Sequence, residues 1–276
     1  MIYIYIYFLA IFNISFANND SLISSHLKIK EIDSIRLASY SKNKFSDKKN
    51  LVKLSFPVLN QPSFSLQYER NIYKKITIGT SVNYTAKQEF FILKAIANKN
   101  ISNEFVKDQL SNIKTTIFSI TPEVKMYLGK EVFKGFYISP FIRFSNYNVD
   151  FPLQYIEDEL EKHYQEVSFS GKFKTVTYGL SFGAQWNVYQ NFYVDWLIIG
   201  PHIGKSNERF ILDSNLSSLQ QKGIKKSLGL IKTTIEETNG IPNINFDYTV
   251  NEKGGEIKIK NPWAGVRLQL GIGYRF

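Results

Sequence analysis

The residue types that could carry chemistry gather in one stretch, residues 150–171. Its six carboxylates are Asp150, Glu157, Asp158, Glu159, Glu161 and Glu166. Clustered carboxylates can hold a divalent cation, and His163 beside them is a pairing that general acid–base catalysis uses. EF-hand spacing, a glycine-rich phosphate loop, a nucleophile elbow and an HExxH motif are all absent. With Leu153, Ile156 and Leu160 spaced for a helix face, we interpret the stretch as a short solvated acidic helix. We expect no catalytic residue, no metal and no cofactor.

Composition narrows the function classes further. The chain has no cysteine, which excludes disulfides, thiolate chemistry and cysteine-based zinc sites. The net charge is +10, but lysine and arginine are scattered and no helix–turn–helix or RNA-binding motif accompanies them. We therefore expect no nucleic-acid partner, and we interpret the charge as attraction to anionic lipid head groups or envelope polymers.

Eight segments alternate apolar and polar residues with the period of two that a β-strand produces. They are residues 51–58, 63–70, 76–85, 115–128, 135–149, 172–187, 192–205 and 262–276. Most reach the roughly 9–11 residues that a tilted barrel strand needs to cross hydrocarbon, and the first two are marginal. Beyond the N-terminus no run approaches the roughly 20 apolar residues of a spanning helix, and the mean hydropathy is −0.20.

The connections between these segments alternate in length. The short ones are 71–75, 129–134 and 188–191, and the long ones are 86–114, 150–171 and 206–261; the short first connection, 59–62, is the exception. Outer-membrane barrels have short periplasmic turns and longer outer loops, so both chain ends are expected on the periplasmic side. Apolar spacing predicts helices within 101–113 and 216–235, and alternation predicts a hairpin over 244–259.

In the last segment, apolar and polar residues lie on opposite faces. Ala264, Val266, Leu268, Leu270, Ile272, Tyr274 and Phe276 share one face, and glycine, arginine and glutamine share the other. No set of amphipathic helices is available to cover such apolar rows, so lipid is their simplest partner. Hydrocarbon offers no hydrogen bonds, so the sheet must close. The sequence predicts an all-β fold: an eight-stranded antiparallel up-and-down transmembrane β-barrel, with short helices and a hairpin in its outer loops.

Charged residues on the opposite face would then point into the lumen. They are Lys53, Glu69, Glu123, Lys125, Arg143, Asp195, Arg267 and Arg275. A barrel of eight strands is just wide enough for side chains to fill it, and unpaired charges there would be costly. We predict a salt-bridged plug in which each of the three carboxylates meets a lysine or arginine. Conduction of ions or protons along these charges is the alternative.

The N-terminus has the features of an export signal. Residues 1–17 form a short apolar run that ends with Ser15 and Ala17 at the spacing of a cleavage site, although it carries no lysine or arginine. A short membrane anchor or a misassigned start are the alternatives. We assign 1–17 to a signal peptide, 18–50 to a poorly ordered periplasmic leader, and 51–276 to the barrel domain.

Several motifs resemble a family of small bacterial outer-membrane β-barrel proteins of unknown function. They are Phe64–Arg70, Ile120–Gly129, Gly135–Phe141, Asp195-Trp196 with Gly200-Pro201, and Pro262–Phe276. The resemblance implies a Gram-negative cell envelope and supplies no catalytic residues. The alternating end, Leu270, Ile272, Tyr274 and Phe276, resembles the signal that the barrel-assembly machinery reads.

These observations favour a non-enzymatic outer-membrane protein with a structural or surface-interaction role through its long outer loops. The expected partners are outer-membrane lipid and, during biogenesis, the assembly machinery; a surface ligand is unspecified, and a monomer is expected. One alternative is an outer-membrane hydrolase or acyltransferase that uses loop or rim residues. A second is a soluble lipocalin-like carrier, which would need an apolar lumen.

Overall fold

The computed structural model describes residues 48–57, 63–158, 163–238 and 245–276. The predicted signal peptide, 1–17, lies outside these residues. So does the predicted leader, except for residues 48–50, of which Asn50 already begins the first strand. The predicted first connection, 59–62, and Leu160 of the predicted acidic helix also lie outside them.

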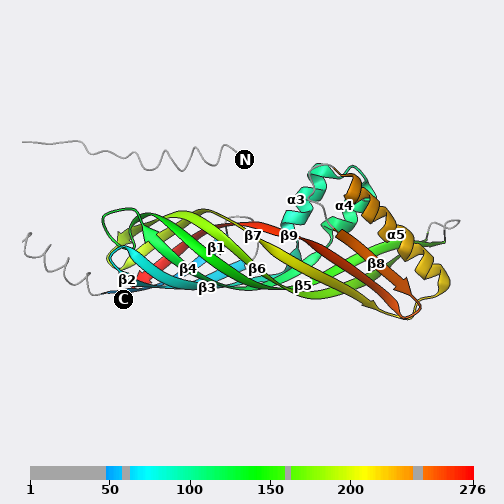
Figure 1. Cartoon of the computed structure of the whole chain (residues 1–276), viewed down its shortest axis with the longest axis horizontal. Coiled ribbons are helices and arrows are strands. Elements are labelled where there is room, and N and C mark those ends of the chain that lie inside the picture. The colour runs from blue at the N-terminus through cyan, green and yellow to red at the C-terminus, as the bar shows by residue number, and fades with distance from the viewer. Residues whose placement is uncertain (1–47, 58–62, 159–162, 239–244) are drawn as a thin grey trace, which may run out of the picture. The chain divides into compact units, whose positions relative to one another are not determined.

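Eight antiparallel strands form a closed ring (Figure 1). They are β1 (Asn50–Pro57), β2 (Ser63–Tyr73), β3 (Ile76–Glu89), β4 (Lys114–Tyr127), β5 (Gly135–Asp158), β6 (His163–Tyr189), β7 (Phe192–Asp213) and β9 (Gly254–Arg275). Each strand pairs with its neighbour in the chain, β7 pairs with β9, and β9 closes onto β1 from Leu51 opposite Arg275 to Pro57 opposite Gln269. The predicted eight-stranded antiparallel barrel is confirmed.

Closure continues to the last residue of the chain. The backbone N–H of Phe276 donates to the carbonyl oxygen of Asn50 at 2.9 Å, and the N–H of Asn50 donates to the carbonyl of Phe276 at 3.0 Å. The beginning of β1 and the C-terminus therefore lie at the same end of the barrel. No edge is left with unpaired backbone groups at that seam.

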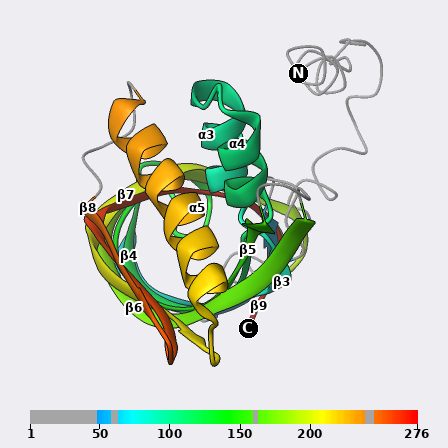
Figure 2. The same ribbon diagram turned by 90° about the vertical axis from the view of Figure 1, so that its right-hand side faces the viewer.

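The opposite end of the barrel is covered by helices and a hairpin. The elements are α3 (Phe91–Asn100), α4 (Glu104–Ser111), α5 (Ser218–Glu237) and β8 (Asn245–Asn251), which pairs with the far part of β9. Asn103 caps α4, and Ser217 and Gln220 form a capping box that starts α5. Viewed from this end, α5 crosses the mouth of the barrel, and α3 and α4 stand at one side of it (Figure 2). Within the described residues, no helix has the length and apolar character needed to cross a membrane.

In its described residues, 150–158 and 163–171, the stretch 150–171 forms strands and not the helix that its spacing suggested. β5 and β6 extend into it and pair from Gly135 opposite Gln185 to Asp158 opposite His163. Phe151, Leu153 and Tyr155 are buried, whereas Gln154 between the last two is exposed. This period of two was present in the sequence, and burial of the aromatic side chains outweighs the weaker helical spacing.

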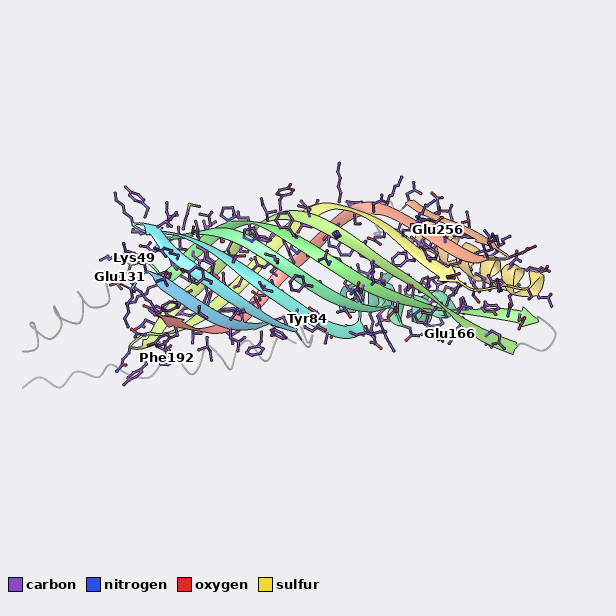
Figure 3. All side chains as sticks on the ribbon, turned by 90° about the horizontal axis from the view of Figure 1, so that it is seen from below. Lys49, Tyr84, Glu131, Glu166, Phe192 and Glu256 are labelled. Carbon is purple, nitrogen blue, oxygen red and sulfur yellow. The ribbon has the colours of Figure 1, made fainter. Side chains whose placement is uncertain are left out.

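The strands exchange the polarity of their two faces partway along their length. In the half that holds Asn50 and Phe276, which we call the chain ends of the barrel, outward residues such as Leu180 and Phe182 are exposed, and inward residues such as Ser181 are buried. Beyond Val176 on β6 the outward residues become polar, and the inward ones become buried aromatics. Figure 3 shows the long axis of this arrangement, with Lys49, Glu131 and Phe192 at one end and Glu166 and Glu256 at the other.

Candidate functional site

The lumen of the half with the chain ends holds a network of buried charges. Lys53 Nζ lies 2.8 Å from Glu69 Oε2, and it also contacts a carboxylate oxygen of Asp195. The amide oxygen of Gln185 accepts a further hydrogen bond from Lys53 at 3.1 Å. Thr77 and Tyr127 each donate a hydroxyl to Glu69 at 2.6 Å. The lysine and both carboxylates therefore have several partners apiece, which a buried charge requires.

Lys125 connects Glu69 and Asp195 to a third buried carboxylate, that of Glu123. Its Nζ lies 3.2 Å from Asp195 Oδ2 and 3.6 Å from Glu123 Oε1. Arg267 Nη1 lies 3.4 Å from Glu123 Oε2, and Gln67 donates to the other Glu123 oxygen. Two lysines and an arginine thus face three carboxylates, so the charges of this cluster balance.

Two glycines, Gly273 on β9 and Gly183 on β6, make space for the cluster. A Cβ added to Gly273 would lie 2.6 Å from Lys53 Cγ, and one added to Gly183 would lie 2.4 Å from the Tyr137 hydroxyl. Tyr137 uses that space to donate its hydroxyl to Asp195 Oδ1 at 2.8 Å. The glycines on the inward face therefore let long polar side chains cross the lumen.

The remaining two predicted lumen residues lie at opposite limits of this cluster. Arg275 is near the chain ends, where it donates to the Tyr193 hydroxyl at 3.2 Å and stacks over Phe133. Arg143 lies on the other side, toward the helices. It donates to Ser119 Oγ at 2.9 Å and to Ser145 Oγ at 3.3 Å, and none of the described carboxylates lies within ion-pair distance of it.

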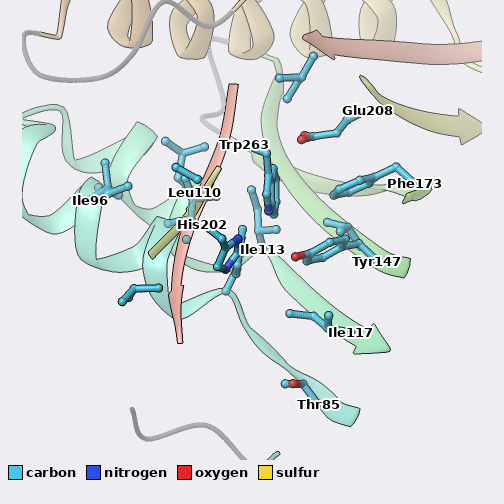
Figure 4. Close-up of a pocket in the computed structure, with 18 of the residues that line it drawn as sticks. Thr85, Ile96, Leu110, Ile113, Ile117, Tyr147, Phe173, His202, Glu208 and Trp263 are labelled. Carbon is cyan, nitrogen blue, oxygen red and sulfur yellow. The ribbon is translucent and has the colours of Figure 1, made fainter. Parts of the chain in front are cut away.

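A cavity of about 430 Å³ begins where the polar lumen ends. Its walls are mainly apolar, and its lining includes Ile113, Tyr147, Phe173 and Trp263 (Figure 4). Arg143, His202, Arg267 and Gln269 lie on its lining as well. We call this space the chamber. The lumen is therefore filled by the charge cluster in one half of the barrel and open in the other.

The upper wall of the chamber carries one buried acid. Glu208 is 6% exposed and accepts a hydrogen bond from Ser206 Oγ at 2.7 Å. It lies beyond the exposed apolar part of β7, where outward Lys205 and Arg209 replace Ile199 and Ile203. Burial raises the pKa of Glu208 to about 7 from its usual 4.5.

The acidic residues singled out in the sequence do not converge on a site. Asp150 forms an ion pair with Lys87 at 2.5 Å, on the outer face of the barrel. Glu159 and Glu161 lie outside the described residues, and His163 is described only as the first backbone position of β6. In the part of the chain that the structure describes, no group of three or more histidine, aspartate or glutamate side chains could hold a metal ion.

The predicted assembly signal forms a continuous outward row on β9. Leu270, Ile272, Tyr274 and Phe276 are 48%, 63%, 45% and 49% exposed. Tyr274 packs against Phe192 of β7, with ring centroids 5.3 Å apart. The row therefore belongs to the apolar exterior of the barrel.

Together, these features define a closed eight-stranded barrel with a charge-filled lumen at one end and a helix-covered chamber at the other. The chain belongs to the family described as "Protein of unknown function (DUF3575)", whose model matches residues 34–238. The matched residues do not include Pro262–Phe276, which carries part of the resemblance noted in the sequence. The comparison with curated proteins found no match.

Several solved structures are similar over most of their length. Ail, the attachment invasion locus protein of Yersinia pestis, is 13% identical, with 83% of this chain and 94% of that chain covered and a TM-score of 0.30. Neisserial surface protein A is 10% identical over 83% and 94%, with a TM-score of 0.28. The translocator domain of the autotransporter NalP from Neisseria meningitidis is 9% identical over 90% and 96%, with a TM-score of 0.32. The fold assigned above rests on the strand pairing of this chain itself.

Proposed function

We propose that this protein is an integral outer-membrane barrel, non-enzymatic, whose helix-covered end faces the cell exterior. The exposed apolar exterior of the half with the chain ends carries the proposal. It includes Leu54, Leu66, Val82, Ile120, Ile142, Leu180, Ile199 and Ile272, one from each of the eight barrel strands, all 38–63% exposed. An apolar surface that surrounds the whole barrel exceeds the few hundred Å² that soluble proteins expose. Hydrocarbon is the environment that stabilises it.

The dimensions of this surface fit one crossing of a bilayer. On β6 the outward apolar row runs from Val176 to Val188, and Lys172 and Lys174 precede it in the chain, on the side of the helices. Such a row covers the roughly 9–11 residues of a tilted membrane strand. The short connections 71–75, 129–134 and 188–191 lie at the same end of the barrel as Asn50 and Phe276, which supports a periplasmic position for this end.

The polarity exchange also bears on the alternative of a soluble carrier. A lipocalin-like carrier needs an apolar lumen and a polar exterior along the whole barrel. Only the half beyond Val176 has that arrangement. The half with the chain ends has fully buried Lys53, Glu69 and Lys125 inside and apolar residues outside, which favours a membrane-embedded plug without a water-filled pore.

A charge placed on either side of the proposed membrane boundary tests this function. Leu180→Arg would put a cation in hydrocarbon at a cost of about 2–4 kcal/mol, so we expect much less heat-modifiable protein in the outer-membrane fraction. Ser170→Arg, on the same face of β6 beyond the apolar row, should insert normally. Equal insertion of both variants, or a native protein that stays monodisperse without detergent, would overturn the proposal.

A further inference from the structure

We propose that the chamber binds a single-chain amphiphile with one anionic group, in the manner of a long-chain carboxylate. The chain would lie among the aromatic and aliphatic walls, and the anionic group would bind Arg143 and Arg267 at the base. This inference goes beyond the proposed membrane function, since a barrel can be embedded in a membrane without binding any ligand.

The size and walls of the chamber fit such a chain. Its volume of about 430 Å³ is in the lower part of the range for ligand cavities. Trp263 stacks edge-on against Tyr147 and Phe173, with ring centroids 4.9 Å and 5.7 Å apart. These rings fix an apolar wall that suits one hydrocarbon chain better than the several chains of a membrane lipid.

The base of the chamber carries one positive charge, that of Arg143, which none of the described carboxylates neutralises. Arg143 has only serine hydroxyls as hydrogen-bond partners among the described residues. The charge cluster below already balances without it, because its three carboxylates face Lys53, Lys125 and Arg267. A buried guanidinium without a counter-ion is costly, and a bound anion would remove that cost.

Two further buried nitrogen atoms at the base have no hydrogen-bond partner among the described residues. Arg267 is 5% exposed, and its Nε has no hydrogen-bond partner, although its Nη1 contacts Glu123. His202 Nδ1 is also buried without a partner. His202 lies opposite Gly265, where an added Cβ would lie 2.7 Å from the imidazole ring, so the glycine allows the ring to take this position. The Arg267 Nε–H is a donor, and His202 Nδ1 can carry a proton and donate. Both therefore favour a ligand group that is anionic and rich in acceptors.

Trp263 provides a direct measurement, because it lines the chamber while Trp186 is 42% exposed on the barrel exterior. We would purify the full chain in a non-ionic detergent with Trp186→Phe and Trp196→Phe, so that Trp263 is the sole tryptophan. The probe is 11-bromoundecanoate, whose bromine quenches nearby indole fluorescence, and its methyl ester is the uncharged match. A second variant, in which Trp186 is the sole tryptophan, measures the quenching caused by probe dissolved in the detergent micelle.

We expect the carboxylate probe to quench Trp263 fluorescence saturably, and more strongly than it quenches Trp186 in the reference variant. Arg143→Gln should weaken it at least about tenfold, as loss of one charge-assisted hydrogen bond does. Arg143→Lys should restore most of the affinity, and the exposed Arg70→Gln should leave it unchanged. Absence of saturable quenching, or equal affinity for the carboxylate and its ester, would overturn the proposal. The comparison of probes needs no change in the chamber and holds even if Arg143→Gln fails to fold.

Discussion

Lys53 of β1 and Asp195 of β7 form an ion pair across the lumen although β9 lies between their strands. Lys53 pairs in register with Gly273 of β9, and Asp195 pairs with Gly271. Because neither glycine has a side chain, the lysine and the carboxylate meet in front of β9. The pair therefore joins the first and the penultimate strands of the ring directly.

We predict that Asp195→Asn lowers the free energy of unfolding by about 3–5 kcal/mol, as removal of one partner from a buried pair does. Lys53 and Lys125 would both lose a carboxylate within 3.2 Å or less. Urea unfolding in lipid or detergent measures the effect. Asp247→Asn is the matched control, because Asp247 forms only an exposed pair with Lys232, and its loss should cost less than about 1 kcal/mol. Equal effects of the two substitutions would contradict the network's role.

Glu123→Ala should also destabilise the barrel, by about 3 kcal/mol or more, because Arg267 would lose its carboxylate while remaining buried. The same unfolding measurement applies. Stability equal to that of the native chain would show that this buried pair contributes nothing.

Arg143→Gln should not lower the free energy of unfolding, in contrast to Asp195→Asn and Glu123→Ala. Arg143 lines the chamber together with Arg267 and has no carboxylate partner among the described residues, so its removal relieves a repulsion between like charges. We expect unfolding free energy that is unchanged or raised by on the order of 1 kcal/mol. A loss as large as that of Asp195→Asn would mean that the native state needs this cation for stability.

The buried Glu208 predicts a pH dependence. Its pKa is raised to about 7 in the folded chain, whereas the unfolded chain has a value near 4.5. Between these values the folded state binds more protons, so the stability contributed by this group falls as pH rises from 4.5 through 7. The loss amounts to at most about 3 kcal/mol. Glu208→Gln should flatten the unfolding free energy between pH 5 and pH 8, and an unchanged pH profile would refute the assignment.

Deletion of Phe276 should reduce insertion in cells more than folding in the test tube. The residue closes the seam with Asn50 through two backbone hydrogen bonds and ends the outward row of β9. We expect a smaller heat-modifiable fraction in membranes, with refolding into detergent largely retained. Phe276→Tyr should insert like the native chain. Normal cellular assembly of the deletion would remove support for the assembly signal.

The strands were predictable because an apolar exterior and a polar lumen impose a strict period of two along each strand. The same rule could have revealed the continuation of β5, since Tyr147, Val149, Phe151, Leu153 and Tyr155 alternate without interruption. The helical spacing of Leu153 and Ile156 and the nearby carboxylates obscured it. The predicted helix and hairpin before the last strand correspond to α5 and to β8 with β9.

The chamber could not be predicted in the same way. Its existence depends on how far the helices stand from the charge cluster, which no local pattern encodes. The sequence also could not show that Arg143 has no carboxylate partner among the described residues. Three carboxylates and five cations lie on the inward rows, and their number does not specify which of them pair. Only their excess of positive charge was evident in the sequence.

In the proposed membrane arrangement, the exchange of face polarity near Val176 fixes how deeply the barrel sits in the bilayer. A shift toward the periplasm would draw Lys172, Lys174 and Lys205 into hydrocarbon, and a shift outward would expose Leu180 and its neighbours to water. Both directions are opposed, so the protein cannot slide to match a thicker or thinner membrane. The surrounding lipid must instead stretch or compress to meet it.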